Sequence, residues 1–188
     1  MSRNRSSRTL TDWTFGIFAA EVRARCRDGL FAADLLDQGL GVRNVDMIWF
    51  ALRSILIAAA AISQLTGGRT GPKRTERASL RHALGIDDHS VLHQRAVRDG
   101  AEHADDRIFR RVESGELANF IGYNVGPKGI VHFDPPQKSF LHFDPTTGVV
   151  SFWDDEVSIP EVLAEIRCIL PLADAAFLKP PNISRPKG

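Results

Sequence analysis

An apolar stretch at residues 47–62 constrains the fold more than any other part of the sequence. Apolar side chains recur in it at spacings of three and four, which is the repeat of an α-helix with one buried face. The stretch is shorter than the roughly 20 residues that cross a membrane, and Arg53 lies near its middle. We therefore expect a buried bundle helix over residues 45–64 and no membrane span.

Further helices are expected around this one. Residues 11–40 are mostly helix formers, and Thr11 or Asp12 can supply the N-cap oxygen. Pro72 begins a short basic helix that Gly85 terminates, because proline is tolerated in a first helical turn and glycine favours a helix end. These segments predict neighbours for the apolar helix.

A fourth helix is expected over residues 87–115. Asp87, Asp88 and Ser90 each offer an N-cap oxygen at its start. Its apolar side chains fall on one stripe of a helical wheel, as in a helix packed in a bundle. That stripe comprises Val97, Ala101, Ala104, Ile108 and Val112.

After residue 118 the pattern changes to short strands. Residues 139–143 and 149–153 are expected to pair as a hairpin, because the proline and glycine between them suit a turn. Ser158 and Glu161 predict the N-terminus of a last helix that runs to about residue 170. Two more strands are expected at residues 120–125 and 129–133.

The expected fold is α+β: a mainly helical, up-and-down bundle of about four helices with a small C-terminal antiparallel β element and a final helix. The chain is expected to divide into four segments. These are a disordered basic N-terminus (residues 1–8), the helical bundle (9–116), the β element with its helix (117–178) and a Pro-rich tail (179–188).

Composition narrows the class of protein. The chain has 188 residues, of which 43% are hydrophobic and 25% charged, and these values fit one ordinary globular domain with at most a small appendage. The net charge of +1 argues against a protein that binds nucleic acid through its whole surface. Any nucleic-acid contact should therefore come from a local patch.

The cysteines and the N-terminus indicate the compartment. Cys26 and Cys168 lie far apart and outside any CxxC pattern, so neither a disulfide framework nor a zinc site is expected. Free, buried thiols in a reducing compartment are the simpler interpretation. Asp12 and Glu21 interrupt the apolar residues near the N-terminus, so no signal peptide is predicted. We expect a soluble cytoplasmic protein without a cofactor.

Residues 98–103, which read Arg-Asp-Gly-Ala-Glu-His, are the most suggestive chemically. Asp99 and His103 are four residues apart on the expected helix, so the carboxylate can hydrogen-bond the imidazole and raise its pKa toward that of a general acid or base. Arg98 lies about 140° around the helix from His103. One helix alone therefore does not focus both groups on one phosphate.

This segment, with Ala104-Asp105-Asp106-Arg107-Ile108 after it, resembles the signature of HEPN-type proteins. In that superfamily an arginine, a polar residue and a histidine, with four positions between arginine and histidine, lie on one helix of a bundle. It is similar in particular to a group of bacterial proteins whose helix reads Arg-Asn-x-x-Glu-His-x-Asp-Glu-Arg. The specific likeness covers about a dozen residues, and residues 10–115 share only the general architecture.

The resemblance implies a metal-independent endoribonuclease that acts as a homodimer. His103 would transfer a proton to or from the RNA, Asp99 would orient His103, and Arg98 would stabilise charge on the phosphate. Two facing copies of the helix would pool arginine and histidine. Some members of the superfamily are toxins, so an antitoxin or another protein is an implied partner. Weaker RNA-contact candidates are Glu102, Arg107, Arg110, Arg74 and Arg77.

The sequence departs from the family pattern in three respects. Asp99 stands where the related group more often has asparagine, and a carboxylate repels phosphate unless it is paired. Gly100 lies in mid-helix, where it costs about 1 kcal/mol relative to alanine. The strand-bearing C-terminal part is absent from the minimal HEPN bundle.

A non-catalytic reading stays open beside the enzymatic one. In it the polar residues of residues 98–107 form surface ion pairs, and the basic side chains of residues 69–81 are a solvated helix face. The chain would then be a helical interaction module that binds RNA or a protein partner.

Two other groups of histidines stand in the sequence. His89 and His93 share a face of the expected helix, with His82 nearby, but the HExxH spacing is absent, so no metal site is predicted. The repeated His-Phe-Asp-Pro pattern can align on adjacent strands, although histidine and aspartate there suit strand faces and turn starts better. It occupies His132, Asp134, His142 and Asp144.

Overall fold

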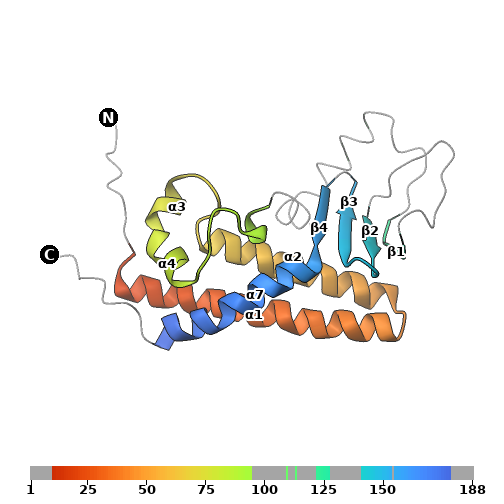
Figure 1. The fold of residues 1–188 in the computed structure, drawn as a ribbon, viewed down its shortest axis with the longest axis horizontal. Coiled ribbons are helices and arrows are strands. Elements are labelled where there is room, and N and C mark those ends of the chain that lie inside the picture. The colour runs from red at the N-terminus through yellow and green to blue at the C-terminus, as the bar shows by residue number, and fades with distance from the viewer. Residues whose placement is uncertain are drawn as a thin grey trace.

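The computed structural model describes residues 10–94, 109, 113, 122–127, 141–153 and 155–178. The fold is α+β and mainly helical (Figure 1). Its long helices are α1 (Asp12–Gly41), α2 (Val45–Leu65) and α7 (Ile159–Leu178), and its short ones are α3 (Pro72–Glu76), α4 (Ala78–Ala83) and the 3₁₀ helix η1 (Val91–His93). Its strands are β1 (Asn124–Val125), β2 (Leu141–Asp144), β3 (Val149–Phe152) and β4 (Asp155–Ser158).

Helices α1 and α2 form an antiparallel hairpin, and both were expected at these positions. Thr11 caps α1 by accepting a hydrogen bond from the Thr14 backbone N–H at 3.3 Å. Asn44 caps α2 in the same way, through Met47 N–H at 3.0 Å. The apolar side chains of α2 that were expected to be buried include Ile48, which is 2% exposed. The two helices lie side by side along their length (Figure 1).

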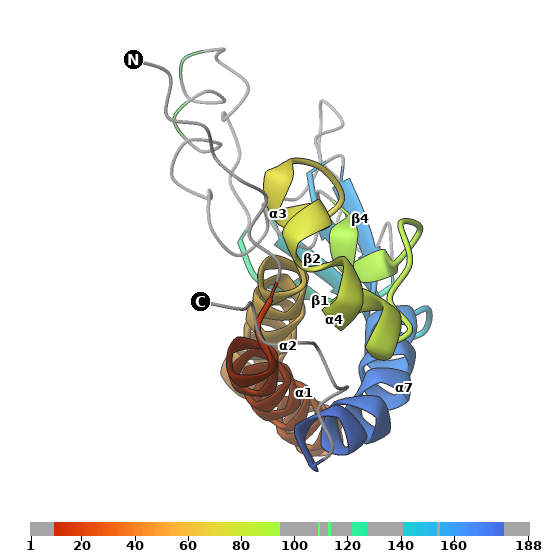
Figure 2. The same ribbon diagram turned by 90° about the vertical axis from the view of Figure 1, so that its left-hand side faces the viewer.

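Helix α7 packs against α1 and completes the helical layer, as the end-on view shows (Figure 2). The three long helices approach one another closely at Gly29 of α1. A Cβ atom built there lies 3.1 Å from Ile166 Cδ1 of α7 and 3.4 Å from Ala58 Cβ of α2. A larger side chain at residue 29 would therefore push the helices apart.

The sheet has the order β1-β2-β3-β4, with β1 parallel to β2 and the other pairs antiparallel. The predicted hairpin is confirmed as β2 and β3. One face of the sheet is apolar and belongs to the same hydrophobic cluster as the helices, through residues such as Phe143 and Val150. The register places four polar residues in one row on the opposite face: Asn124, His142, Ser151 and Glu156.

The boundaries of two helices differ from those expected. The basic helix is divided into α3 and α4 at Arg77, whose guanidinium turns back to the end of α2. The last helix continues past Pro171 to Leu178. A proline interrupts only local hydrogen bonds, whereas the buried residues that follow it, such as Ala173, keep the helix packed on the core.

Three further expectations are corrected. Asp87, Asp88 and Ser90 do not begin an α-helix: a turn and η1 stand there. Asp88 bonds Arg74 and Arg81, whereas Ser90 caps the short η1 by accepting the Leu92 N–H at 3.2 Å. Strand β4 was not expected, and it comes directly before α7. Cys26 is buried as expected, and its burial raises the thiol pKa to about 12, but Cys168 is exposed.

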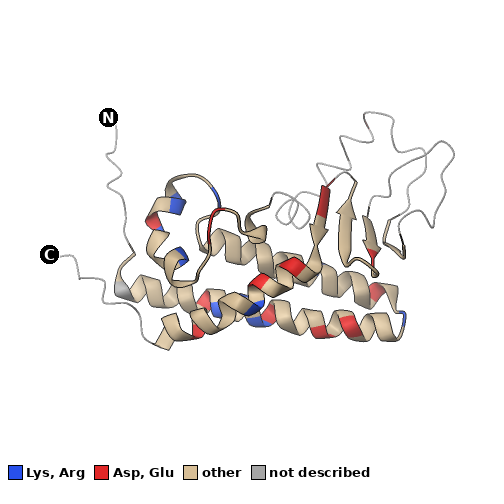
Figure 3. Ribbon diagram, viewed as in Figure 1, with Lys and Arg blue, Asp and Glu red and all other residues tan. Residues whose placement is uncertain are grey.

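Among the described helices, α2 alone is long and apolar enough to cross a membrane. In its 18-residue apolar stretch, 56% is buried inside the protein. Its charged residues are Asp46 and Arg53 alone. Charged side chains are instead concentrated on α1, on α7 and around α3 and α4 (Figure 3). The burial of α2 is that of a core helix, as expected from its spacing.

We predict that Gly29→Leu lowers the free energy of unfolding by at least about 2 kcal/mol, because the new side chain overfills the contact between α1, α2 and α7. Urea denaturation measures this change. Gly16→Leu is the matched control, since no atom outside its own helical turn lies within 4 Å of a Cβ built at Gly16, and it should change stability by less than about 1 kcal/mol. Equal effects of the two changes would contradict the close contact.

Candidate functional site

The residues of the expected RNA-cleaving motif fall outside the part of the chain that the structure describes. This holds for Arg98, Asp99 and His103, and also for Glu102, Arg107 and Arg110. Two described residues of the expected fourth helix, Phe109 and Glu113, are helical. The segment that leads into the motif is described as far as Gln94, four residues before Arg98.

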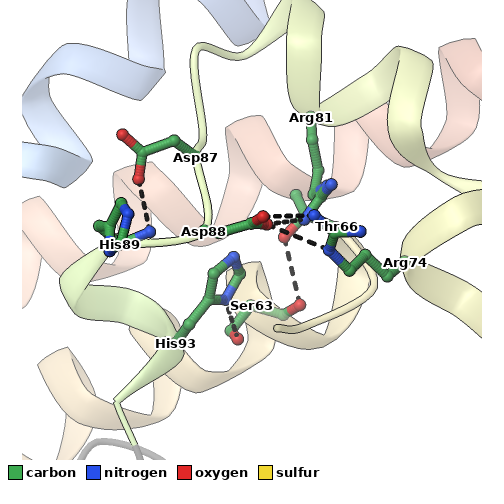
Figure 4. A network of polar contacts seen from close by, with 8 residues as sticks. All are labelled: Ser63, Thr66, Arg74, Arg81, Asp87, Asp88, His89 and His93. Carbon is green, nitrogen blue, oxygen red and sulfur yellow. Dashed lines mark hydrogen bonds and ion pairs between the residues drawn. The ribbon is translucent and has the colours of Figure 1, made fainter. Parts of the chain in front are cut away.

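A cluster of polar side chains surrounds this leading segment at the C-terminal end of α2 (Figure 4). We call it the His93 cluster, and it comprises Ser63, Arg74, Arg81, Asp88 and His93. Its members come from α2, α3, α4, the loop after α4, and η1. Five segments of chain therefore meet through side-chain polar groups at one place.

Asp88 is the centre of charge in the cluster. It accepts a hydrogen bond from Arg81 at 3.0 Å and from Arg74 Nε at 3.1 Å, and it forms a second contact with Arg74 Nη2. The hydrogen bonds from Arg74, followed by those from Arg81, hold the pKa of the Asp88 carboxyl at about 2. The loop after α4 is thereby tied to both short basic helices.

His93 lies near this group and bonds to α2. Its Nδ1 lies 2.8 Å from Ser63 Oγ, within hydrogen-bond distance, and Ser63 is buried in α2. Its Nε2 is buried and has no hydrogen-bond partner among the described residues. Burial, and then the positive charge of Arg81, lower the His93 pKa below 6.5. The imidazole is therefore neutral at neutral pH.

Helix α7 also binds residues 90–93, which His93 ties to α2. Glu165 accepts a hydrogen bond from the Val91 N–H at 3.0 Å and another from the Ser90 hydroxyl. Val91 and Leu92 are buried in the hydrophobic core. The backbone of residues 90–93 is thus fixed between α2 and α7, directly before the segment that carries the motif.

Arg74 and Arg77, which were considered as RNA contacts, both have partners within the chain. Arg74 pairs with Asp88. Arg77 donates to the carbonyl oxygens of Gln64 and Leu65, where α2 ends, and its guanidinium lies 4.5 Å from the ring centroid of Phe18. An RNA contact by either arginine stays a prediction.

The histidines do not gather into a metal site within the described residues. His89 is exposed in a turn and His93 belongs to η1, so the helical face that they were expected to share does not exist. In the sheet, His142 Nδ1 lies 3.0 Å from Asn124 Nδ2, and Asp144 accepts the Thr146 N–H at 2.8 Å to begin the hairpin turn. His132 and Asp134 lie outside the described residues.

Sequence reasoning missed Ser63 and the role of Asp88. Ser63 interrupts the apolar pattern of α2 on its buried side, and a lone buried hydroxyl at such a position needs a hydrogen-bond partner, from its own helix or from another element. That signal was available in the sequence. The identity of the partner was not, because His93 lies 30 residues further along the chain.

Comparison with known proteins gives no further guide to the site. No known protein family matches the chain, and neither the curated proteins nor the solved structures give a significant match.

We predict that Asp88→Asn destabilises the protein at pH 7 and weakens its dependence on pH between about 4 and 2. The Asp88 pKa is lowered from 3.8 to about 2 on folding, so its contribution is present above the unfolded pKa and is lost as pH falls through the folded value. Urea denaturation at several pH values tests this. Asp34→Asn, at an exposed carboxylate of α1, is the control; a parent-like acid profile in Asp88→Asn would refute the role of the pair.

A second prediction concerns His93. Because folding lowers its pKa from 6.5, its contribution to stability is present above the unfolded pKa and declines as pH drops below about 6.5. His93→Gln should therefore flatten the fall in unfolding free energy between about pH 7 and 5. Chemical denaturation measures the profile, with His89→Gln at an exposed histidine as control. An unchanged slope in His93→Gln would show that this imidazole is not the responsible group.

Proposed function

We propose that the chain is a HEPN-like, metal-independent endoribonuclease, or a toxin-type protein with this activity, and that it acts in the cytoplasm. The observation that carries the proposal is the order and spacing of Arg98, Asp99 and His103. The mainly helical fold is compatible with it. The fixed backbone of residues 90–93 also supports it, because a catalytic segment needs an anchored start.

The proposed reaction uses only groups of the chain and the RNA. The ribose 2′-oxygen attacks the adjacent phosphorus while its proton passes to a base, and the bond to the 5′-oxygen breaks as that oxygen takes up a proton. His103 performs one of these proton transfers, oriented by Asp99. Arg98 stabilises the negative charge that builds on the phosphate oxygens. The products are a 2′,3′-cyclic phosphate and a free 5′-hydroxyl.

The proposal includes a homodimer and, for a toxin, an antitoxin partner. On the helix expected from the sequence, Arg98 and His103 would lie about 140° apart, so two facing copies would complete each site. An acidic partner would bind at the short basic helix α3, where Lys73 is exposed.

A second function, that of a non-catalytic interaction module, is favoured by a different observation. Large apolar side chains are exposed on α1, at Trp13 (79%) and Phe31 (66%). Exposed aromatic residues of this kind are common in contacts with proteins or with RNA bases. In this alternative the helical bundle binds its partner without cleaving it.

We predict that the purified protein cleaves single-stranded RNA in the presence of a metal chelator. Arg98→Ala and His103→Ala should each lower the cleavage rate about 100-fold or more, because each removes a group that acts in the transition state. The rate is measured on a labelled RNA by gel electrophoresis. His82→Ala changes an exposed histidine outside the motif and serves as control.

The two functions give different results in this experiment. If the parent cleaves no RNA in chelator, or if both variants cleave as fast as the parent, the ribonuclease proposal is wrong. RNA binding without cleavage would then favour the interaction module. Circular dichroism of each variant shows whether a loss of activity comes from unfolding.

A further inference from the structure

The side of α2 opposite its buried residues is mostly apolar, and the described part of the chain leaves it uncovered. On this side Phe50 is 62% exposed and Ile57 is 55% exposed. We call it the outer face of α2, and it comprises Phe50, Ser54, Ile57 and Ala61. The Ser54 hydroxyl donates a hydrogen bond to the Phe50 carbonyl oxygen at 2.8 Å, so covering this face would leave no unpaired donor.

The chain leaves the described part of the structure near one end of this face and returns near the other. It leaves one residue after His93, whose Nδ1 lies 2.8 Å from Ser63 Oγ close to the C-terminal end of α2. It returns one residue before Tyr123, whose ring centroid lies 5.7 Å from that of Trp49 in the first two turns of α2. Residues 95–121 are therefore tethered to α2 at both ends.

The sequence of this segment suits the distance that it has to span. Ser63 and Trp49 are separated by about 21 Å along the axis of α2. The apolar stripe of the expected fourth helix, from Val97 to Val112, would be about 22 Å long. The order of the two tethers makes such a helix run antiparallel to α2.

Two residues of the segment are described, and both fit a helix whose apolar stripe is turned toward α2. Phe109 and Glu113 are helical and exposed. On a helical wheel they lie about 100° and 140° from Ile108, which is at the centre of the stripe. They occupy the flank and the outer side of the expected helix, which stay exposed when the stripe itself is covered.

The tether at Ser63 also sets the register of the two helices. If Val97 begins the contact beside Gln64, four pairs of residues face each other. These pairs are Ala101 with Ala61, Ala104 with Ile57, Ile108 with Ser54 and Val112 with Phe50. Two pairs place a large side chain against a small one, the two alanines permit a close approach, and no charged residue enters the contact.

A tethered segment has an advantage over a separate molecule as the occupant of this face. Its effective concentration at the face is on the order of millimolar, because the connections at both ends keep it nearby. Its binding also costs no loss of free translation, whereas that of a second molecule does. The segment of the same chain is therefore favoured over a second copy or a lipid surface.

We propose that residues 97–112 form a helix that packs antiparallel on the outer face of α2. Asp99 and His103 would then point away from α2 into solvent, because they lie about 180° and 140° from Ile108 on the helical wheel. The polar side of the motif would be displayed on an open surface, where a large partner such as RNA can reach it. This placement of the motif does not depend on cleavage and holds for either proposed function.

The first test is disulfide formation in Ala61→Cys/Ala101→Cys, in a Cys168→Ser background that removes the exposed natural thiol. We expect an intramolecular disulfide to form at least about 10-fold faster than in the control Ala61→Cys/Asp99→Cys, because Asp99 is on the opposite side of the helix. Residue 99 is nearer the tether, so an undocked segment would link it at least as fast. Non-reducing gel electrophoresis and peptide mass spectrometry measure the rates.

Two outcomes of this test would overturn the proposal. Equal rates in the two double variants, or no intramolecular disulfide in either, would show that residues 97–112 do not dock on α2 in this register. A covalent dimer formed readily by the single variant Ala61→Cys would assign the outer face to a second copy of the chain instead.

The second test is hydrogen exchange of the backbone amides of residues 97–112. We expect exchange at least about 100-fold slower in the parent than in a peptide of the same sequence, and about 10-fold or more faster in Phe50→Asp than in the parent. Phe31→Asp is the matched control, since Phe31 is 66% exposed on α1, and it should change the rates by less than about 3-fold.

Unprotected amides in the parent, or equal effects of Phe50→Asp and Phe31→Asp, would contradict the docking. Circular dichroism shows whether each variant is folded. Both tests are made without RNA, so their outcome is separate from that of the cleavage assay. A parent that cleaves nothing would refute the ribonuclease and leave the docking of residues 97–112 to be decided by the disulfide and the exchange rates.

Discussion

The close approach of α1, α2 and α7 at Gly29 is the contact on which the other described features depend. Because Gly29 has no Cβ, Ile166 and Ala58 can approach the α1 backbone from two sides. This proximity sets the position of α7, and α7 in turn carries Glu165 to the Ser90 hydroxyl and the Val91 N–H. The packing of the helical core therefore determines where residues 90–93, which precede the motif, are held.

The sequence predicted the elements whose signals are local. Helices α1 and α2 have long periodic patterns with capping residues at their ends, and the β2–β3 hairpin has a proline and a glycine in its turn, so all three could be recognised. The continuation of α7 past Pro171 could not, because it depends on packing against α1. Strand β4 was hidden for a similar reason: its charged residues, Asp155 and Glu156, suit a strand only because β3 is beside it.

The candidate site was predictable in residue type more than in arrangement. The basic character of residues 69–81 was visible, but which arginine pairs with which acid was not. Asp88 had the appearance of a helix cap because aspartate suits that position, yet two arginines from α3 and α4 compete for its carboxylate and prevail. Ion pairs between elements of this kind compete with local capping, which contributes about 1 kcal/mol, and here two arginines act on one carboxylate.

The junction of β4 and α7 has a consequence for how the molecule moves. Strand β4 ends at Ser158 and α7 begins at Ile159, with no loop between them, while the Ile159 N–H donates to the Gly148 carbonyl at 3.0 Å. The hairpin turn, the edge strand and the first turn of the helix are thus joined as one mechanical element. A rotation of the sheet would therefore also rotate α7, and the side chain of Glu165 on that helix would move with it.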